Sequence, residues 1–314
     1  MRGRRASGWR SQRGEAAGRQ GARRSKGGGA MARYAIVTET GGDIPAEHVE
    51  RYGLELAPMH VTFGEKSFDD GAFPVSDIFD HYRATGDLPR TSGCTPQDFA
   101  DTFARVDARD PEATILYLAY SACTTCSFES ARMAAEGRDN VVAIDTKSVT
   151  AGLFLVVTNT ARFLEEHPDA EVDEVRAFVD SQVARSRMAF IPGGLEFLRA
   201  GGRLSNGAYL GAQLLRIKPV IEILDGKLVA TKKLRGSMEK AVLALVGDFI
   251  TREPLDRSRV ALIRNEGLDE TLQRQVVEKL RDAGFQEIEW IETGGVISSH
   301  CGPGSFGIAS LAAE

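Results

Sequence analysis

The 314-residue sequence lacks any apolar run close to the roughly 18 residues that a membrane span requires. Its best apolar run is the short segment 151–157, so we expect a soluble protein. Cysteine is also scarce, with only Cys94, Cys123, Cys126 and Cys301. The N-terminal segment has no secretory signal, so we expect a reducing, cytoplasmic location and no structural disulfides.

Several motifs of well-known enzyme classes are missing. The sequence contains no G-x-S-x-G elbow, no H-E-x-x-H helix and no Walker loop. Gly302, Gly304 and Gly307 do satisfy a G-x-G-x-x-G spacing. A short apolar strand follows them rather than a helix, and no acidic residue that could bind a ribose lies far enough downstream. We therefore expect no nucleotide site and no cofactor.

Positive charge is concentrated at the N-terminus. Residues 1–30 contain nine Lys or Arg and a single acid, Glu15, although the whole chain has a formal charge of −5. This Gly-rich, apolar-poor segment cannot bury a core, so we expect it to be disordered. It is an RNA-binding arm, a targeting segment or the product of a misassigned start before Met31, and we favour the last. The acidic remainder argues against a nucleic-acid partner.

From residue 33 the pattern alternates between strand and helix. Strands over 34–37, 114–118 and 141–144 are each followed by a helix, which predicts a parallel sheet with ligands beyond its carboxyl ends. After residue 187 the pattern includes a hairpin at Asp225-Gly226 and further strands and helices. We expect two α/β domains, 31–186 with a mainly parallel sheet and 187–314 with a mixed sheet.

The segment Arg90–Pro96 places three hydroxyls and a glycine directly before an amphipathic helix. Thr95 is suited to be the N-cap and Pro96 the first helical residue, while Phe99, Phe103 and Val106 form the buried stripe. Because the first turn of a helix has unpaired N–H groups, hydroxyls beside it form a small anion cradle. The alternative is a capped loop that binds nothing.

Further candidate side chains lie in three other segments. Ser121–Ser127 is a second hydroxyl-rich loop between a strand and a helix. Gly201-Gly202 frees the backbone at Arg203, a partner for a carboxylate or phosphate or else a surface cation. His300, among glycines, is a donor to a ligand or else a plain turn histidine. No carboxylate is evident to orient His300 in a nucleophilic triad, so this donor set favours binding over turnover.

Two hypotheses from other classes stay open. In the first, Ser121 or Thr125 acts with His300 as an acyl hydrolase. In the second, the C-x-x-C pair Cys123 and Cys126, with Cys94 and Cys301, forms a zinc or redox centre. Only one of the two C-x-x-C pairs expected of such a zinc site is present, and the four thiols are otherwise small residues tolerated in a tight pocket.

From Arg33 to the C-terminus the sequence resembles the DegV family, which includes the fatty-acid-binding subunits of bacterial fatty acid kinase. The resemblance rests on five motifs in the family's order. They are Thr38–Pro45, Thr91–Pro96 for T-S-x-P-S-P, Ser121–Ala131 for S-S-x-L-S-G-T-Y-Q-S-A, Leu198–Ser205 for L-x-x-G-G-R-I-S followed by Lys218-Pro219 and Asp225-Gly226, and His300–Gly304 for H-x-G-P-G.

The resemblance implies two α/β domains with a lipid tunnel at or near their interface. Thr91 and Thr125 would hold the carboxylate of a long-chain fatty acid. Supporting pocket residues would be Ser92, Ser121, Cys126, Arg203 and His300. The family further implies that the bound acid is presented to a separate ATP-dependent kinase subunit, which phosphorylates the carboxylate. This chain would be the non-catalytic carrier.

The sequence departs from the family pattern in the second hydroxyl-rich loop. Ala122, Thr124, Thr125 and Cys126 replace serine, leucine, serine and glycine, so a glycine that lets backbone approach an anion is lost. Cys94 and Thr95 likewise replace proline and serine in the first motif. We therefore expect an altered head-group pocket.

Overall fold

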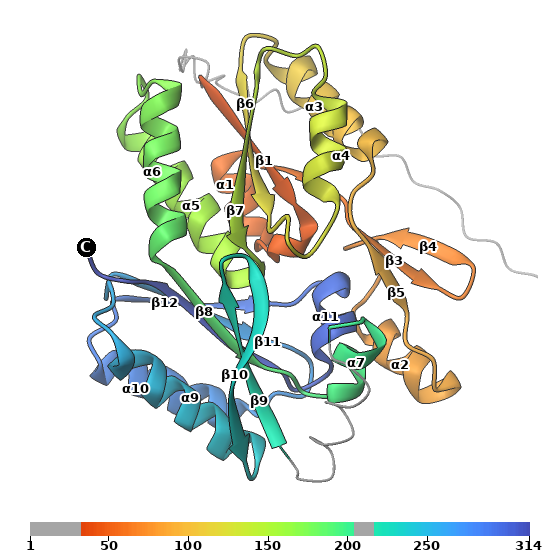
Figure 1. The fold of residues 1–314 in the computed structure, drawn as a ribbon, viewed down its shortest axis with the longest axis vertical. Helices are drawn as coiled ribbons and strands as arrows, with labels where there is room; N and C mark the ends of the chain where they lie inside the picture. Colours follow the sequence, from red (N-terminus) through yellow and green to blue (C-terminus); the bar gives the residue numbers. More distant parts are fainter. Residues whose placement is uncertain (1–32, 204–216) are drawn as a thin grey trace, which may run out of the picture. The chain divides into compact units, whose positions relative to one another are not determined.

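The computed structural model describes residues 33–203 and 217–314 (Figure 1). The basic segment 1–30 and two residues of the L-x-x-G-G-R-I-S motif, Leu204 and Ser205, lie outside the described residues. The strands are β1 (Tyr34–Glu39), β2 (Glu55–Ala57), β3 (His60–Phe63), β4 (Lys66–Asp69), β5 (Arg90–Ser92), β6 (Thr114–Tyr120), β7 (Val141–Ser148), β8 (Ser186–Ile191), β9 (Ile217–Leu224), β10 (Lys227–Arg235), β11 (Arg259–Arg264), β12 (Glu287–Glu292) and β13 (Phe306–Leu311). The helices are α1 (Ala46–Tyr52), α2 (Ser76–Thr85), α3 (Pro96–Arg109), α4 (Ser127–Ala134), α5 (Thr150–Glu166), α6 (Val172–Arg185), α7 (Leu195–Ala200), α9 (Met238–Arg252), α10 (Glu270–Asp282) and α11 (Gly295–Cys301), with a 3-10 turn η1 (Thr40–Gly42).

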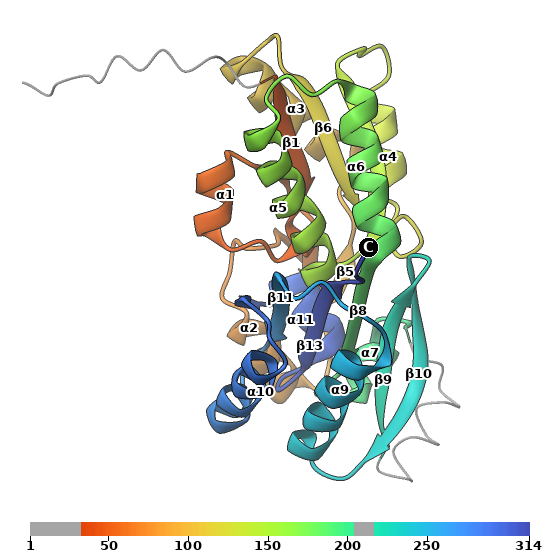
Figure 2. The ribbon, with the colours of Figure 1, turned by 90° about the vertical axis from the view of Figure 1, so that its left-hand side faces the viewer.

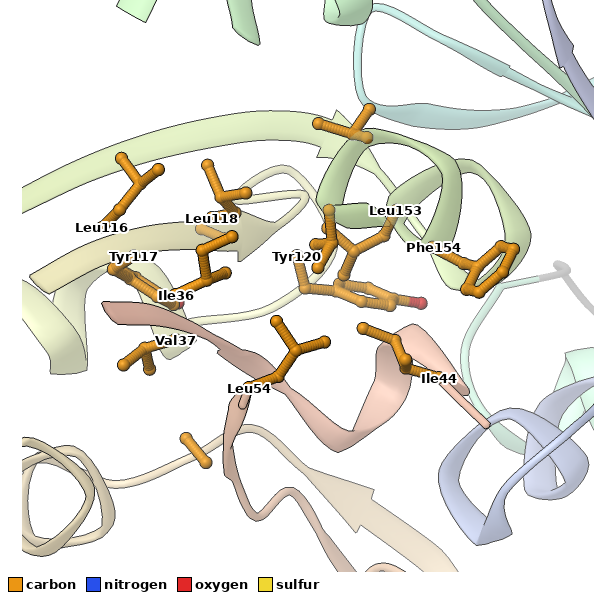
Figure 3. Close-up of a cluster of buried hydrophobic side chains, with 14 of the residues drawn as sticks. Ile36, Val37, Ile44, Leu54, Leu116, Tyr117, Leu118, Tyr120, Leu153 and Phe154 are labelled. Atoms are coloured by element: carbon orange, nitrogen blue, oxygen red, sulfur yellow. The ribbon is translucent and has the colours of Figure 1, made fainter. Parts of the chain in front are cut away.

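The first sheet is parallel, as the strand–helix alternation predicts. Its order is β2-β1-β6-β7, and all three pairings are parallel. Strand β6 is buried along nearly its whole length because helices cover both faces of the sheet. Side chains of β1 and β6 pack with Leu153 and Phe154 of α5 in the larger core cluster (Figure 3).

The second sheet is mixed and has the order β10-β9-β8-β13-β11-β12. Strands β11 and β12 are parallel, and the other pairings are antiparallel. Helices α9 and α10 lie side by side along one face of this sheet (Figure 2) and share its core cluster. The predicted hairpin is confirmed, since Asp225 and Gly226 connect β9 to β10 with positive φ angles.

Helix α5 contacts strands of both sheets. It contains the longest apolar run of the sequence, and its residues from Thr150 to Thr158 are all buried. A helix that is apolar on every side belongs in a protein interior. The run noted in the sequence is therefore the element shared by the two sheets.

Helix α3 begins as the sequence predicts. Thr95 Oγ1 accepts a hydrogen bond from the Asp98 N–H at 3.2 Å, and the Asp98 carboxylate accepts one from the Thr95 N–H at 2.7 Å. This reciprocal arrangement is a capping box. The predicted stripe of Phe99, Phe103 and Val106 is fully buried.

Two segments expected to be loops are regular elements. Residues 90–92 form β5, which pairs with β3 in a small antiparallel sheet of order β4-β3-β5. His300 and Cys301 end helix α11 instead of lying in a loop. Both expectations were wrong for the same reason: short segments with weak propensity take the structure that distant partners impose.

The passage from α6 to β8 occurs at residues 185–186, next to the expected domain boundary at 187. The division into domains 31–186 and 187–314 stays a prediction. Among the described residues, no helix combines the length and apolar character needed to cross a membrane.

We predict that the free energy of unfolding depends on Glu39. This carboxyl accepts hydrogen bonds from Tyr117 Oη at 2.6 Å and the Tyr120 N–H at 2.8 Å, yet complete burial raises its pKa from 4.5 to about 7. Because the unfolded chain has the lower pKa, ionising Glu39 disfavours the fold as pH rises from about 4.5 to 7, by about 3 kcal/mol in total.

The measurement is urea unfolding at several pH values, compared with Glu39→Gln. We expect the free energy of the variant to fall less than that of the wild-type chain across this window. Parallel pH profiles for the two proteins would contradict the assignment.

Candidate functional site

A cavity of about 370 Å³ lies among the two larger sheets, β5 and α11. Much of its wall is apolar, and the apolar lining residues are Met59, Val149, Met188, Phe190, Leu198, Leu228, Ile263, Val296, Ile297 and Phe306. Among the described residues, hydroxyl groups, the imidazole of His300 and the guanidinium of Arg203 also line it. Of the site residues predicted from sequence, the cavity brings together Thr91, Ser92, Thr125, Cys126, Arg203 and His300.

Thr91 and His300 contact each other directly. Thr91 lies on β5 and His300 in the last turn of α11, and the distance between Thr91 Oγ1 and His300 Nε2 is 2.7 Å. These residues are 209 positions apart in the chain. Their contact therefore depends on the docking of α11 beside β5.

Thr125 belongs to the loop between β6 and α4. Its hydroxyl lies 3.0 Å from Ser127 Oγ and accepts the Ser127 N–H at 3.2 Å. Ser127 Oγ in turn accepts the Cys94 N–H at 3.0 Å, which joins this loop to the segment after β5. A Cβ at Gly93 would collide with Thr125 Oγ1, so the approach of the two segments requires glycine there.

Arg203 extends from the end of α7 to the same loop. Its guanidinium donates to the carbonyl oxygens of Thr124 at 3.0 Å and Gly201 at 2.6 Å. The side chain is exposed and lines the cavity. It places a positive charge beside the hydroxyls and closes α7 against the β6–α4 loop.

Ser121 is not among the lining residues. It is fully buried, and its hydroxyl donates to the Gly226 carbonyl oxygen at the tip of the β9–β10 hairpin at 2.7 Å. The serine therefore joins the hairpin tip to the end of β6. Ser121 was predicted to support the pocket, and its contact with the pocket is indirect. It bonds to the hairpin whose strand β10 carries Leu228, a lining residue.

A family model described as an uncharacterised protein of the DegV family matches residues 33–313. The chain belongs to the DegV family.

Relatives of this DegV chain match it over nearly their whole length. A DegV domain-containing protein of Deinococcus radiodurans is 29% identical over 279 residues, which is 88% of this chain and 97% of that protein. A protein of Thermotoga maritima named fatty acid-binding protein is 24% identical, covering 87% of this chain and 95% of its own. A solved structure described as fatty-acid binding of a DegV family protein from Thermus thermophilus matches with a TM-score of 0.77 and 27% identity, over 90% of this chain and 100% of that one.

The contacts of Ser121, Thr125 and His300 do not match the acyl-hydrolase hypothesis. Neither Ser121 Oγ nor Thr125 Oγ1 is hydrogen-bonded to His300, whose hydroxyl partner is Thr91. His300 Nδ1 is buried and has no hydrogen-bond partner in the described part of the chain, so no carboxylate orients the ring there. Such a ring is poorly arranged to act as the base of a hydrolase.

The four thiols of this DegV chain do not form one cluster. Cys94 and Cys301 are buried, whereas Cys123 and Cys126 are exposed, and all four are free. Within residues 33–203 and 217–314, no three His, Cys, Asp or Glu side chains come together in a way that could hold a metal ion. Cys126 precedes α4 and lines the cavity beside Thr125.

Most of the apolar wall, together with Tyr120 and Thr150, was not predicted from the sequence. Tyr120 ends β6, and Thr150 begins α5. Both residues lie at the carboxyl ends of apolar strands, β6 and β7. Because ligands bind beyond the carboxyl ends of parallel strands, this position would have allowed both to be predicted as site residues. The residues from β8, β10, β11 and β13 gave no such signal, because alternating strand residues look alike whether they face a core or a cavity.

The imidazole of His300 is electrostatically unusual. Burial and then the positive charge of Arg203 lower the pKa of His300 from 6.5 to about 4. The ring is therefore neutral near pH 7 and can offer one N–H donor and one acceptor. A neutral donor beside an exposed guanidinium suits an anionic oxygen.

We predict that His300 stays neutral down to about pH 5 in the ligand-free protein. Since the unfolded chain has the higher pKa, stability contributed by neutral His300 is complete above about pH 6.5 and falls as pH drops towards 4. The measurement is ¹⁵N NMR of the histidine rings, with His300 assigned from a His300→Gln sample. Arg203→Gln should raise the midpoint, and a wild-type midpoint near 6.5 would refute the assignment.

We also predict that Gly201→Ala displaces the ring of His300. A Cβ at Gly201 would collide with His300 Nδ1, although the backbone there has an ordinary helical φ of −74°. We expect changed ring signals of His300 in the same spectra. The matched control is Gly202→Ala, which strains a residue with φ of 73° but meets no atom within 4 Å. Equal changes in both variants would rule out a specific collision.

Proposed function

We propose that this DegV protein binds a long-chain fatty acid, with the carboxylate at Thr91, Thr125 and His300 and the acyl tail along the apolar wall. The observation that carries the proposal is that one cavity combines this wall with donors from β5, the β6–α4 loop and α11. Its volume is within the roughly 300–1,000 Å³ typical of small-molecule sites. The names of the relatives from Thermus thermophilus and Thermotoga maritima support the same ligand class.

The tail and the head of the ligand contribute differently. Burial gains roughly 0.8 kcal/mol per CH₂, so about fourteen methylenes gain on the order of 10 kcal/mol before entropy is subtracted. A hydrogen bond to the charged head nets only about 1.5–3 kcal/mol. The apolar wall therefore supplies affinity, and the polar residues supply orientation and selectivity for an acid.

The proposal extends to the fate of the ligand. The chain acts as a cytoplasmic, non-catalytic carrier that presents the carboxyl group to a separate ATP-dependent kinase for acyl-phosphate formation. The polar residues support this part because Ser92, Cys126 and Arg203 are exposed lining residues beside the hydroxyls. A partner enzyme could therefore reach the carboxylate without entry into the apolar part of the cavity.

The departures in the second hydroxyl-rich loop fall directly at the proposed head-group site. Thr125 retains a hydroxyl at the place of the family's serine, and Cys126 adds a thiol at the place of its glycine. We infer that carboxylate binding is preserved, because the hydroxyl rather than the glycine supplies the donor.

We predict that Thr91→Ala lowers the amount of fatty acid retained by the purified protein and leaves the fold intact. The variant loses a hydroxyl that would donate to the carboxylate and that contacts His300 Nε2. The affinity for the fatty acid should therefore fall about tenfold or more. The measurement is mass spectrometry of an organic extract from native protein, quantified per mole of chain.

Thr62→Ala is the matched control, because Thr62 lies on the neighbouring strand β3 and its hydroxyl contacts Ser67 instead of the cavity. The control should retain the wild-type amount of lipid. Wild-type protein without an acyl ligand, or equal lipid content in Thr91→Ala and wild type, would overturn the proposed function. Turnover of an ester substrate would show an enzyme instead of a carrier.

A further inference from the structure

Helix α11 is held at its N-terminus by two carboxylates from distant segments. It follows Gly294, which offers no capping side chain. The Gly294 N–H donates to Asp43 Oδ1 at 2.8 Å, and the N–H groups of Gly295 and Val296 donate to Asp70 Oδ1 at 2.6 and 3.3 Å. The N–H groups that a helix start leaves unpaired are therefore satisfied by residues more than 200 positions away.

The second oxygen of Asp43 holds another part of the cavity wall. Asp43 Oδ2 accepts a hydrogen bond from Thr150 Oγ1 at 2.5 Å. Thr150 has φ of 34°, a conformation that costs energy in a β-branched residue and persists only where neighbours enforce it. Asp43 itself has φ of 51°. Two uncommon backbone conformations thus meet at one hydrogen bond beside the cavity.

Neither carboxylate lines the cavity, but the segments they hold do. Val296, Ile297, His300 and Cys301 of α11 are lining residues, as is Thr150. The Asp70 N–H also donates to the carbonyl oxygen of Met59, another lining residue, at 2.7 Å. The two acids are therefore bonded to three separate parts of the cavity wall, namely α11, Thr150 and Met59, and neither acid lines the cavity itself.

The arrangement is costly to maintain, which argues for a specific role. Asp43 and Asp70 are only 8% and 6% exposed, and burial raises the pKa of both carboxyls. The helix has only seven residues, too few to be stable by itself. Backbone N–H donors and the partial positive charge of the helix start offset part of the cost of burying the two acids.

The sequence provides the close approach that these contacts need. A Cβ at Gly294 would lie 3.2 Å from the nearest carboxylate oxygens of both Asp43 and Asp70. A Cβ at Gly295 would lie 2.8 Å from the ring of Phe73 and 3.0 Å from Asp70 Oδ1. The pair of glycines lets both acids reach the helix start together.

We propose that Asp43 and Asp70 form a carboxylate clamp that positions α11, so that His300 meets Thr91 at the cavity. They are positioning residues and do not touch the ligand. The effect on ligand affinity rests on the proposed fatty-acid binding, whereas the effect on His300 does not. Loss of the clamp moves the C-terminal end of α11 and lets the backbone of Thr150 relax. His300 then moves away from Thr91, so the two donors no longer face the same ligand.

The test compares Asp43→Ala with Asp43→Asn in the full chain. Asparagine tolerates a positive φ, keeps an oxygen that accepts the Gly294 N–H and can donate to Thr150 Oγ1. The first readout is the ¹⁵N ring signals of His300 in ligand-free protein. The second is the affinity for palmitic acid, measured by calorimetry on delipidated protein.

We expect Asp43→Ala to shift the His300 signals and to weaken palmitic acid binding about tenfold. Asp43→Asn should return the His300 signals to their wild-type positions and the affinity to within about threefold of wild type. Asp269→Ala is the matched control. Asp269 caps α10 by accepting the Leu272 N–H at 2.9 Å, and it lies outside the cavity lining. Its loss should lower thermal stability without a change in either readout.

Unchanged His300 signals in Asp43→Ala would overturn the clamp, and so would equal changes in Asp269→Ala. Failure of Asp43→Asn to restore the signals would also overturn it, because the proposed contacts survive in that variant. If wild-type protein binds no palmitic acid but Asp43→Ala still moves the His300 signals, the clamp stands and the proposed function fails.

Discussion

The 2.7 Å contact between Thr91 Oγ1 and His300 Nε2 is the interaction on which the site depends. It joins a strand of the small antiparallel sheet to the end of a seven-residue helix near the C-terminus. Neither element is stable alone, because a three-residue strand and a seven-residue helix gain little from their own hydrogen bonds. Their positions follow from packing against the two larger sheets and from the acids that hold α11.

The apolar side of the site depends on the same packing. Helix α5 is covered by both sheets, and its first residue, Thr150, lines the cavity together with the preceding Val149. The cavity lining combines apolar walls with hydroxyl, imidazole and guanidinium groups, the two kinds of surface that the proposed amphipathic acid would contact.

The departures from the DegV pattern lie both in the loop and in the segment that holds it. Cys94 stands at the place of a proline and supplies the N–H that donates to Ser127 Oγ, a donor that proline lacks. The hydroxyls of Thr125 and Ser127 and the Cys94 N–H are joined by hydrogen bonds of 3.0 Å, and the Gly93 backbone lies against Thr125. Cys126 lines the cavity but no described hydrogen bond depends on its thiol. The arrangement of the neighbouring hydroxyls therefore does not depend on the thiol at the place of the family's glycine.

The sequence by itself determined the parallel sheet, the hairpin at Asp225-Gly226, the capped start of α3 and the set of polar candidates. These features depend on periodicity, turn residues and capping within a few positions, which are local in the chain. The tertiary structure decided that residues 90–92 are a strand, that His300 ends a helix and that Ser121 bonds a hairpin tip. It also decided the apolar wall, because each of those outcomes depends on contacts between residues far apart in the sequence, and no local pattern encodes them.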